Sequence, residues 1–218
     1  MQKLILIKNK VNEIINKKQL KNKPEIIVVT KTFSLIKFEP ILKSGHLHFG
    51  ENKVQEAENK WPEIKKSHKN LKLHMIGKLQ SNKAKKAIKI FDYIHSLDSI
   101  KLATKIDQYQ KELNKKVKLF IQVNIGNESQ KAGILLNDFE KFYHYCTKNL
   151  SLDIIGLMCL PPHNLNSKEY FLTLKKLGNK FNLNDFSMGM SSDYEDALLS
   201  GSTYLRLGSA ILGERVIT

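Results

Sequence analysis

One pattern recurs eight times along the sequence: a short apolar run, rich in β-branched residues, followed by a polar segment whose apolar residues have helical spacing. Alternating strands and helices predict a parallel sheet with helices packed against it. Eight such units in 218 residues leave little room for insertions, which predicts a closed (β/α)8 barrel of the TIM type. The expected strands are residues 25–30, 47–50, 71–77, 93–97, 117–124, 154–160, 186–188 and 203–207.

No linker or break in composition divides the chain, so we expect residues 1–218 to form a single α/β domain. An extra helix should precede the first strand, because Leu4, Ile7 and Val11 recur on one helical face. The alternative architecture is a doubly wound open sheet. We favour the barrel, because the first strand lacks the Gly-x-Gly-x-x-Gly turn of a dinucleotide-binding sheet.

The formal charge of +15, from 36 basic and 21 acidic residues, raises the possibility of a nucleic-acid partner. The lysines, however, are spread along every predicted helix, and the richest runs, 8–23 and 65–89, contain no aromatic residue. This spread is typical of solvated helix faces. We therefore expect no specific nucleic-acid binding, although the summed field should attract anionic ligands.

The location of the protein is also suggested by what the chain lacks. No apolar run has the length of a membrane-spanning helix, and residues 1–20 contain no signal-peptide core. We expect a cytoplasmic protein with no membrane partner. Cys146 and Cys159 lie in a predicted helix and a predicted buried strand, without metal-ligand spacing, so free thiols and no metal site are expected.

Two turns at the ends of the last two strands have the composition of a phosphate site. Residues 190–193 (Met-Ser-Ser-Asp) open one predicted helix and residues 208–210 (Gly-Ser-Ala) open another. Barrels often hold phosphate at this place, because free N–H groups and the helix dipole favour an anion. The alternative is structural: Ser192 caps a helix in a capping box with Glu195, and Gly208 serves only as a turn.

Lys31 directly follows the first buried strand and should project into the barrel mouth. A desolvated lysine keeps a neutral fraction and can attack an aldehyde to form an imine. Opposite a phosphate site, this suggests either a phosphorylated sugar aldehyde or pyridoxal phosphate. Arg206, two residues before Gly208, should point inward by strand alternation. Its guanidinium would either form a salt bridge inside the barrel or donate to the ring nitrogen of a bound pyridine.

Several ordered segments carry a more specific signal. They are VTKT at 29–32, FGENKVQE at 49–56, HMIGKLQSNK at 74–83, QVNI at 122–125, GLM at 156–158, SMGMS at 187–191 and RLGSAILG at 206–213. Together they resemble the pyridoxal phosphate homeostasis protein family, also called the YggS-like or proline synthetase co-transcribed family. The fold of that family is the N-terminal barrel of alanine racemase, a fold type III pyridoxal phosphate protein. The resemblance covers essentially the whole chain.

The resemblance implies pyridoxal 5′-phosphate as the cofactor, bound as a Schiff base on Lys31. The other cofactor-binding residues that it implies are Asn52 beside the cofactor, Met158 in the pocket wall, Ser191, Gly208 and Ser209 at the phosphate, and Arg206 near the pyridine nitrogen. The chain departs from the family pattern in three places. Ser209 replaces the usual Thr, Leu212 replaces the usual Phe, and the connection 161–167 looks shorter, which would widen the pocket mouth.

The expected function follows from these residues. Arginine is permanently protonated and can only donate, so it would leave the ring nitrogen unprotonated and weaken the electron sink. Racemisation also needs a second acid/base group, which the barrel racemases take from a C-terminal domain across a dimer; this chain ends at Thr218. We therefore expect a monomeric carrier or buffer of pyridoxal phosphate with no catalytic residues, serving pyridoxal phosphate-dependent apoenzymes. The alternatives are a weak amino-acid racemase or related enzyme and a nucleic-acid-binding protein.

Overall fold

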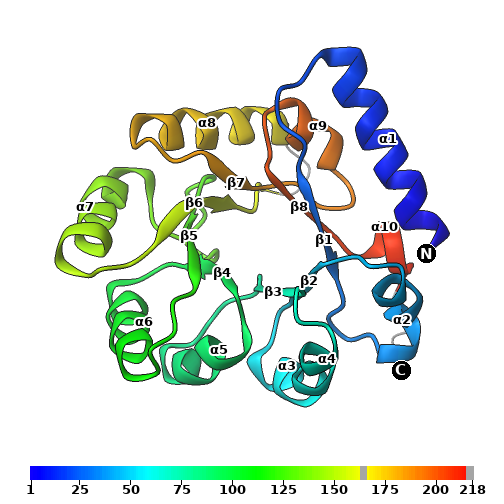
Figure 1. The fold of residues 1–218 in the computed structure, drawn as a ribbon. Helices are drawn as coiled ribbons and strands as arrows, with labels where there is room; N and C mark the ends of the chain where they lie inside the picture. Colours follow the sequence, from blue (N-terminus) through cyan, green and yellow to red (C-terminus); the bar gives the residue numbers. More distant parts are fainter. Residues whose placement is uncertain (163–165, 215–218) are drawn as a thin grey trace.

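Eight parallel strands close into a barrel in a computed structural model that describes residues 1–162 and 166–214 (Figure 1). Each strand pairs with the next along the chain, and β8 pairs with β1. This confirms the predicted (β/α)8 barrel and excludes the open sheet. The strands are β1 (Glu25–Val29), β2 (His48–Glu51), β3 (Lys72–Met75), β4 (Tyr93–Leu97), β5 (Lys118–Val123), β6 (Ile154–Cys159), β7 (Asp185–Ser187) and β8 (Tyr204–Leu207).

Helices surround the barrel as an outer ring (Figure 1). They are α1 (Gln2–Lys18), α2 (Leu35–Lys43), α3 (Val54–Lys60), α4 (Pro62–Ser67), α5 (Ala84–Ile90), α6 (Ile100–Glu112), α7 (Phe139–His144), α8 (Ser167–Lys180), α9 (Tyr194–Leu199) and α10 (Ser209–Leu212). Two short 3-10 helices, η1 (Ser81–Lys83) and η2 (Leu136–Asp138), and one π-helical segment, η3 (Tyr145–Asn149), complete the described helices. None of these described helices is both long and apolar enough to cross a membrane. The shortened connection expected at 161–167 lies partly outside the described residues, since 163–165 are not described.

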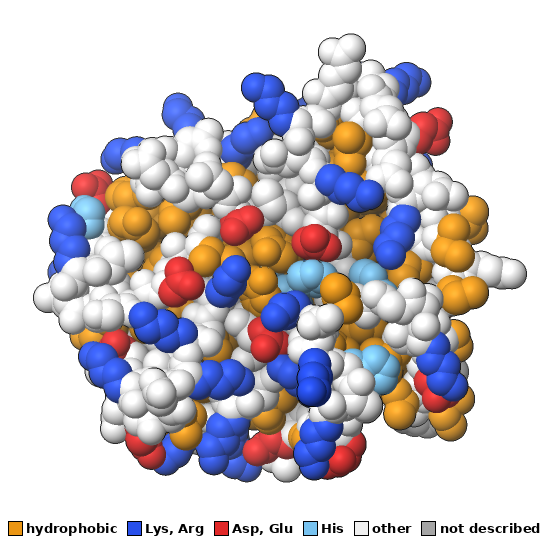
Figure 2. All heavy atoms as spheres, viewed as in Figure 1, with side chains coloured by type: hydrophobic (Ala, Val, Ile, Leu, Met, Phe, Trp, Pro, Cys, Tyr) orange, Lys and Arg blue, Asp and Glu red, His pale blue; other side chains and the backbone are white. Residues whose placement is uncertain are grey.

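The extra N-terminal helix is confirmed. In α1, Leu4, Ile7 and Val11 are buried, and the helix ends at Lys18, followed by the C-cap residue Gln19 in a left-handed conformation. α1 contacts α10, so the two ends of the described chain pack together. Figure 2 shows basic side chains scattered among polar and acidic ones over the face seen in Figure 1. This agrees with a positive charge that is spread over solvated helices.

The core has two parts. A large apolar cluster lies between the strands and the helices, where Trp61, Phe38 and Phe171 are fully buried. A smaller cluster fills the barrel interior and contains Ile27, Tyr93, Phe120, Met158 and Tyr204. The interior also holds buried polar side chains. Cys146 and Cys159 are free and buried, and burial raises the pKa of both thiols to about 12.

Candidate functional site

A cavity of about 340 Å³ lies at the carboxyl ends of the strands, where barrels of this class carry their sites. It brings together most of the residues that the sequence singled out. Those lining the cavity are Lys31, Asn52, Ser191, Arg206, Gly208 and Ser209, and the wall is completed by Val29, Ile76, Leu160, Met190 and Ser192. Sequence reasoning missed the apolar wall residues Ile76 and Leu160, which directly follow the observed strands β3 and β6.

Met158 does not line this cavity. It is buried in the interior cluster with Phe120 and Tyr204, and its neighbour on the adjacent strand is Ser187. Side chains two residues apart on a strand face the same way, so Leu160 points in the same direction but lies nearer the mouth. Leu160 therefore occupies the place in the wall that we expected for Met158.

The backbone that leads into Lys31 is anchored through the preceding residue, Thr30. The buried carboxylate oxygen Oε1 of Glu51 accepts hydrogen bonds from Thr30 Oγ1 at 2.7 Å, Lys60 Nζ at 2.9 Å and Trp61 Nε1 at 2.9 Å. Lys60 Nζ also donates to the Thr30 carbonyl at 3.0 Å. Burial raises the pKa of Glu51, while the charge of Lys60 lowers it.

The residue after Lys31 is fixed as well. Thr32 has a φ of 67°, which a β-branched residue adopts only under constraint. Its N–H donates to Glu56 Oε1 at 2.6 Å, and Lys60 holds the same oxygen at 2.8 Å. Since Thr30 and Thr32 are both anchored to one ionic cluster, the backbone of Lys31 has a defined position at the cavity.

Asn52 enters the cavity from the end of β2. The chain after β3 passes close to it, because a Cβ added to Gly77 would lie 2.4 Å from the Asn52 carbonyl oxygen. Only glycine permits this approach. Gly77 therefore has a packing role in placing Asn52, which explains a glycine two residues after β3.

The two turns predicted to hold phosphate are joined to each other. Ser191 Oγ accepts a hydrogen bond from the Ala210 N–H at 3.1 Å, so the turn after β7 is tied to the first turn of α10. The alternative capping box is not formed: α9 begins after Asp193, which shows no side-chain capping bond, and Asp193 Oδ1 instead accepts from the Met190 N–H at 2.6 Å. Hydroxyl and N–H groups of both turns thus meet at one side of the cavity.

Arg206 enters the cavity from β8, on the same side as these turns. Its guanidinium is buried and donates to Ser187 Oγ at 2.7 Å and to the Cys159 carbonyl at 2.9 Å. Within residues 1–162 and 166–214 it forms no ion pair, so the alternative of a salt bridge inside the barrel is not observed there. Burial lowers the pKa of Arg206, and an acceptor placed in the cavity would offset that cost.

Comparison with known proteins gives a consistent answer. The sequence profile described as alanine racemase, N-terminal domain, matches residues 6–216. The pyridoxal phosphate homeostasis protein of Synechocystis is 33% identical over 200 residues, covering 88% of this chain and 91% of that protein. The chain belongs to the pyridoxal phosphate homeostasis protein family. The Helicobacter pylori protein of the same name is 35% identical over 196 residues and covers 87% of each chain.

Solved structures agree with the assignment. PipY of Synechococcus elongatus superposes with a TM-score of 0.83 at 32% identity, over 93% of this chain and 100% of its own. A second structure of PipY, with pyridoxal phosphate bound, superposes with a TM-score of 0.79. Alanine racemase of Clostridium difficile shares the fold at 16% identity, with a TM-score of 0.70 over 57% of its length.

Proposed function

We propose that this protein binds pyridoxal 5′-phosphate reversibly through a Schiff base on Lys31 and acts in pyridoxal phosphate homeostasis as a carrier or buffer. One observation carries the proposal: a lysine, a buried arginine and the paired turns at Ser191 and Gly208 line a single cavity. Relatives with 30% identity or more are named for this role, and PipY has a structure with the cofactor bound.

The residues present suit the shape and charge of this cofactor. The Ser191 and Ser209 hydroxyls and the first turn of α10 suit a phosphate group, which favours N–H and O–H donors. Ile76, Leu160 and Val29 supply apolar walls for a ring. Arg206 points at the cavity from the same side as Gly208 and is a donor for a neutral ring nitrogen. Asn52 would lie beside the bound group.

The covalent step uses only Lys31 and the aldehyde. The lone pair of the neutral Lys31 amine forms a C–N bond to the aldehyde carbon, and loss of the carbonyl oxygen as water leaves a C=N bond. No electrons are gained or lost, and hydrolysis reverses the step. A reversible bond of this kind limits the free aldehyde while allowing its release, which is what a cofactor buffer requires.

The competing hypothesis is a weak amino-acid racemase. Proton exchange at the α-carbon needs an acid/base group on each side of the bound substrate. Apart from Lys31, none of the described residues that line the cavity is Tyr, His, Cys, Asp or Glu. This favours a carrier. Exchange of α-protons with solvent, measured for a panel of amino acids, would separate the hypotheses, and robust turnover would overturn the carrier.

The cofactor site is tested by borohydride reduction of the loaded protein, followed by peptide mapping. We expect one phosphopyridoxyl adduct, on Lys31, and loss of the absorption of the Schiff base in Lys31→Ala. The exposed Lys53, next to Asn52, provides the control: Lys53→Ala should retain both. An adduct on another lysine, or an unchanged spectrum in Lys31→Ala, would contradict the assignment.

Delivery and assembly belong to the same proposal. We propose pyridoxal phosphate-dependent apoenzymes as recipients, a monomeric state and a cytoplasmic location. Reactivation of an apoenzyme by the loaded protein, compared with an equal concentration of free cofactor, tests delivery. Sedimentation equilibrium tests the monomer.

A further inference from the structure

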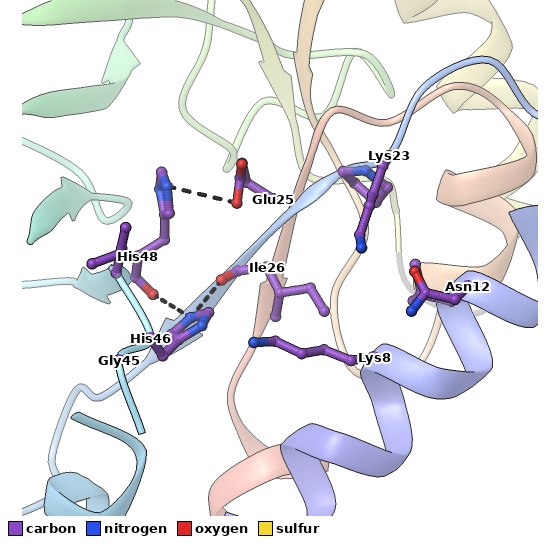
Figure 3. A pocket seen from close by; sticks show the side chains of 11 residues that line it. Lys8, Asn12, Lys23, Glu25, Ile26, Gly45, His46 and His48 are labelled. Atoms are coloured by element: carbon purple, nitrogen blue, oxygen red, sulfur yellow. Dashed lines mark hydrogen bonds and ion pairs between the residues drawn. The ribbon is translucent and has the colours of Figure 1, made fainter. Parts of the chain in front are cut away.

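A second cavity, also of about 340 Å³, lies at the opposite end of the barrel, where the strands begin (Figure 3). It lies between α1, the segment leading into β1 and the connection from α2 to β2. Its volume is within the range of small-molecule sites. The residues that line it are Lys8, Val11, Asn12, Lys23, Pro24, Glu25, Ile26, Gly45, His46, Leu47 and His48.

The charges in this cavity suit an anion. Figure 3 shows the Lys8 and Lys23 side chains extending from two different segments toward the Ile26 side chain. In the part of the chain that the structure describes, neither amine forms an ion pair or hydrogen bond. The one carboxylate, Glu25, is exposed and contacts His48 Nε2 at 3.6 Å. Two ammonium groups in a cavity that is also lined by the apolar residues Val11 and Ile26 match a dianion with a small organic part.

His46 lies in the wall of this cavity, and the positive charge of Lys8 affects the pKa of its ring. Its Nε2 lies 2.9 Å from the Ile26 carbonyl and 3.0 Å from the His48 carbonyl, so this nitrogen carries the hydrogen. Burial, and then the positive charge of Lys8, lower the pKa of His46 to about 4. The ring is therefore neutral at pH 7 and does not compete with the lysines for an anion.

His48 begins a chain of hydrogen bonds through the barrel interior to the first cavity. Its Nδ1 lies 3.0 Å from His74 Nε2, and His74 Nδ1 lies 2.9 Å from His95 Nε2. His95 Nδ1 lies 2.7 Å from Ser187 Oγ, which accepts from Arg206 at 2.7 Å. His74, His95 and Ser187 are fully buried, so solvent does not interrupt the chain.

Arg206 favours one direction for this chain: a guanidinium can only donate, so Ser187 Oγ accepts from it. The hydrogen of Ser187 finds an acceptor when it is donated to His95 Nδ1. The Nε2 hydrogens of His95 and His74 must then point to the next ring, and His48 Nε2–H faces Glu25. Burial lowers the pKa of His74 and of His95 well below the usual value, which keeps both rings neutral.

A proton added to His48 would reverse this order. Its Nδ1 would become a donor, so His74 Nε2 would have to accept. The hydrogen of His74, and likewise that of His95, would then move from Nε2 to Nδ1. Ser187 Oγ would then accept from both His95 and Arg206, and its own hydrogen would leave His95. The groups that face or act on His48 are Glu25 from β1, His46 from the α2–β2 connection, Lys72 and His74 from β3, Asp92 before β4, Tyr93 from β4 and Tyr204 from β8.

We propose that the second cavity is an effector site for a small phosphate monoester, held by Lys8 and Lys23, and that its occupation is transmitted to Arg206 through His48, His74, His95 and Ser187. The added negative charge favours a protonated His48 and hence the reversed chain. Two discrete tautomer arrangements form the two-state element that coupling between distant sites requires. The binding stands independently of the proposed function; the effect on the cofactor rests on it.

Binding is tested by calorimetric titration of glycerol 3-phosphate into protein whose first cavity is filled by pyridoxal phosphate and reduced with borohydride. Should that cavity take no cofactor, the same titration is made with the unloaded protein. We expect saturable binding that weakens at least tenfold in the double variant Lys8→Ala, Lys23→Ala. The control removes the same charge from the exposed face of α1, in Lys3→Ala with Lys17→Ala. Equal losses in both variants would show general charge attraction and overturn the site.

Transmission is tested in the wild-type protein by ¹⁵N NMR of the histidine rings, which needs no cofactor. We expect His74 and His95 to carry hydrogen on Nε2 without glycerol 3-phosphate and to shift toward Nδ1–H when it is bound. Unchanged tautomers at saturation would overturn the coupling. In the loaded protein, glycerol 3-phosphate should shift the cofactor absorption. His74 lines neither cavity, so His74→Phe should abolish that shift while both ligands still bind. A shift that survives in this variant would exclude this route.

Discussion

The hydroxyl of Thr30 donates to Glu51 Oε1 at 2.7 Å, which fastens the end of β1 to the end of β2 one residue before Lys31. The same oxygen accepts from Lys60 and Trp61, so one buried carboxylate organises the first strand end, α3 and α4. Lys60 in turn holds Glu56, the acceptor for the Thr32 N–H. The position of the reactive amine therefore depends on a cluster that does not touch the cavity.

Replacing this carboxylate should loosen Lys31. Glu51→Gln keeps an oxygen for one donor but removes the charge that compensates Lys60 in a buried setting, so we expect a loss of about 2 kcal/mol in the free energy of unfolding. Cofactor affinity should fall with it, measured by absorption titration. Glu63→Gln is the control, because Glu63 pairs with Lys66 on the surface and should change stability by less than about 0.5 kcal/mol. Equal effects would contradict the role of Glu51.

Ser191 should matter for the phosphate and not for the aldehyde. Its Oγ anchors the Ala210 N–H and faces the cavity, so Ser191→Ala should weaken pyridoxal 5′-phosphate about tenfold, which corresponds to about 1.4 kcal/mol. Pyridoxal without phosphate should bind the variant and the wild type alike. Ser192→Ala, a neighbouring cavity residue, should have the smaller effect. Equal losses for both ligands would show a general distortion of the site.

Much of the architecture was readable from the sequence. All eight strands were predicted within two residues at each end, because β-branched runs and helical spacing alternate regularly. The cavity residues were also predictable, since polar side chains directly after parallel strands meet at one end of a barrel. Met158, which the resemblance placed in the pocket wall, lies in the interior cluster instead, because residues that face the same way on a strand differ in depth along the barrel axis.

The polar interior was not predicted. His95 bonds to Ser187 across 92 residues, and this pairing depends on the register between strands that are not neighbours in sequence. Arg206 likewise finds its acceptors on β6 and β7, where a buried carboxylate had been the alternative. Strand alternation places a polar side chain inside the barrel, but the partner follows from three-dimensional spacing alone.

The buried histidines should make the protein sensitive to acid. The pKa of His46 is lowered from 6.5 to about 4 in the folded state, so the unfolded chain takes up a proton first as the pH falls. The free energy of unfolding is therefore highest above about pH 6.5 and decreases toward pH 4. At pH 5, protonation of His46 in the unfolded chain alone should lower it by about 2 kcal/mol. Urea unfolding at pH 7, 6 and 5 measures the decrease. His46→Gln, which keeps a donor for the Ile26 carbonyl, should show a shallower dependence, and an identical slope would contradict this assignment.

Gly208 offers a test that separates the demands of the ligand from those of the fold. Its backbone is outside the left-handed region, and an added Cβ would meet the Val29 side chain at 3.4 Å, close to an ordinary contact. The apoprotein should therefore accept Gly208→Ala with a change of less than about 1 kcal/mol in stability. The methyl group would, however, lie at the cavity beside Ser209, where the backbone must approach the phosphate closely, so cofactor affinity should fall at least tenfold.

Gly156→Ala provides the contrast. Its Cβ would lie 1.9 Å from the Asp185 carbonyl oxygen, so the β6–β7 pair could not form unchanged and the barrel itself should be strongly destabilised. Thermal unfolding of both apoproteins, with cofactor titration of Gly208→Ala, decides the matter, because destabilisation of Gly208→Ala to the level of Gly156→Ala would mean that the fold, and not the ligand, requires this glycine.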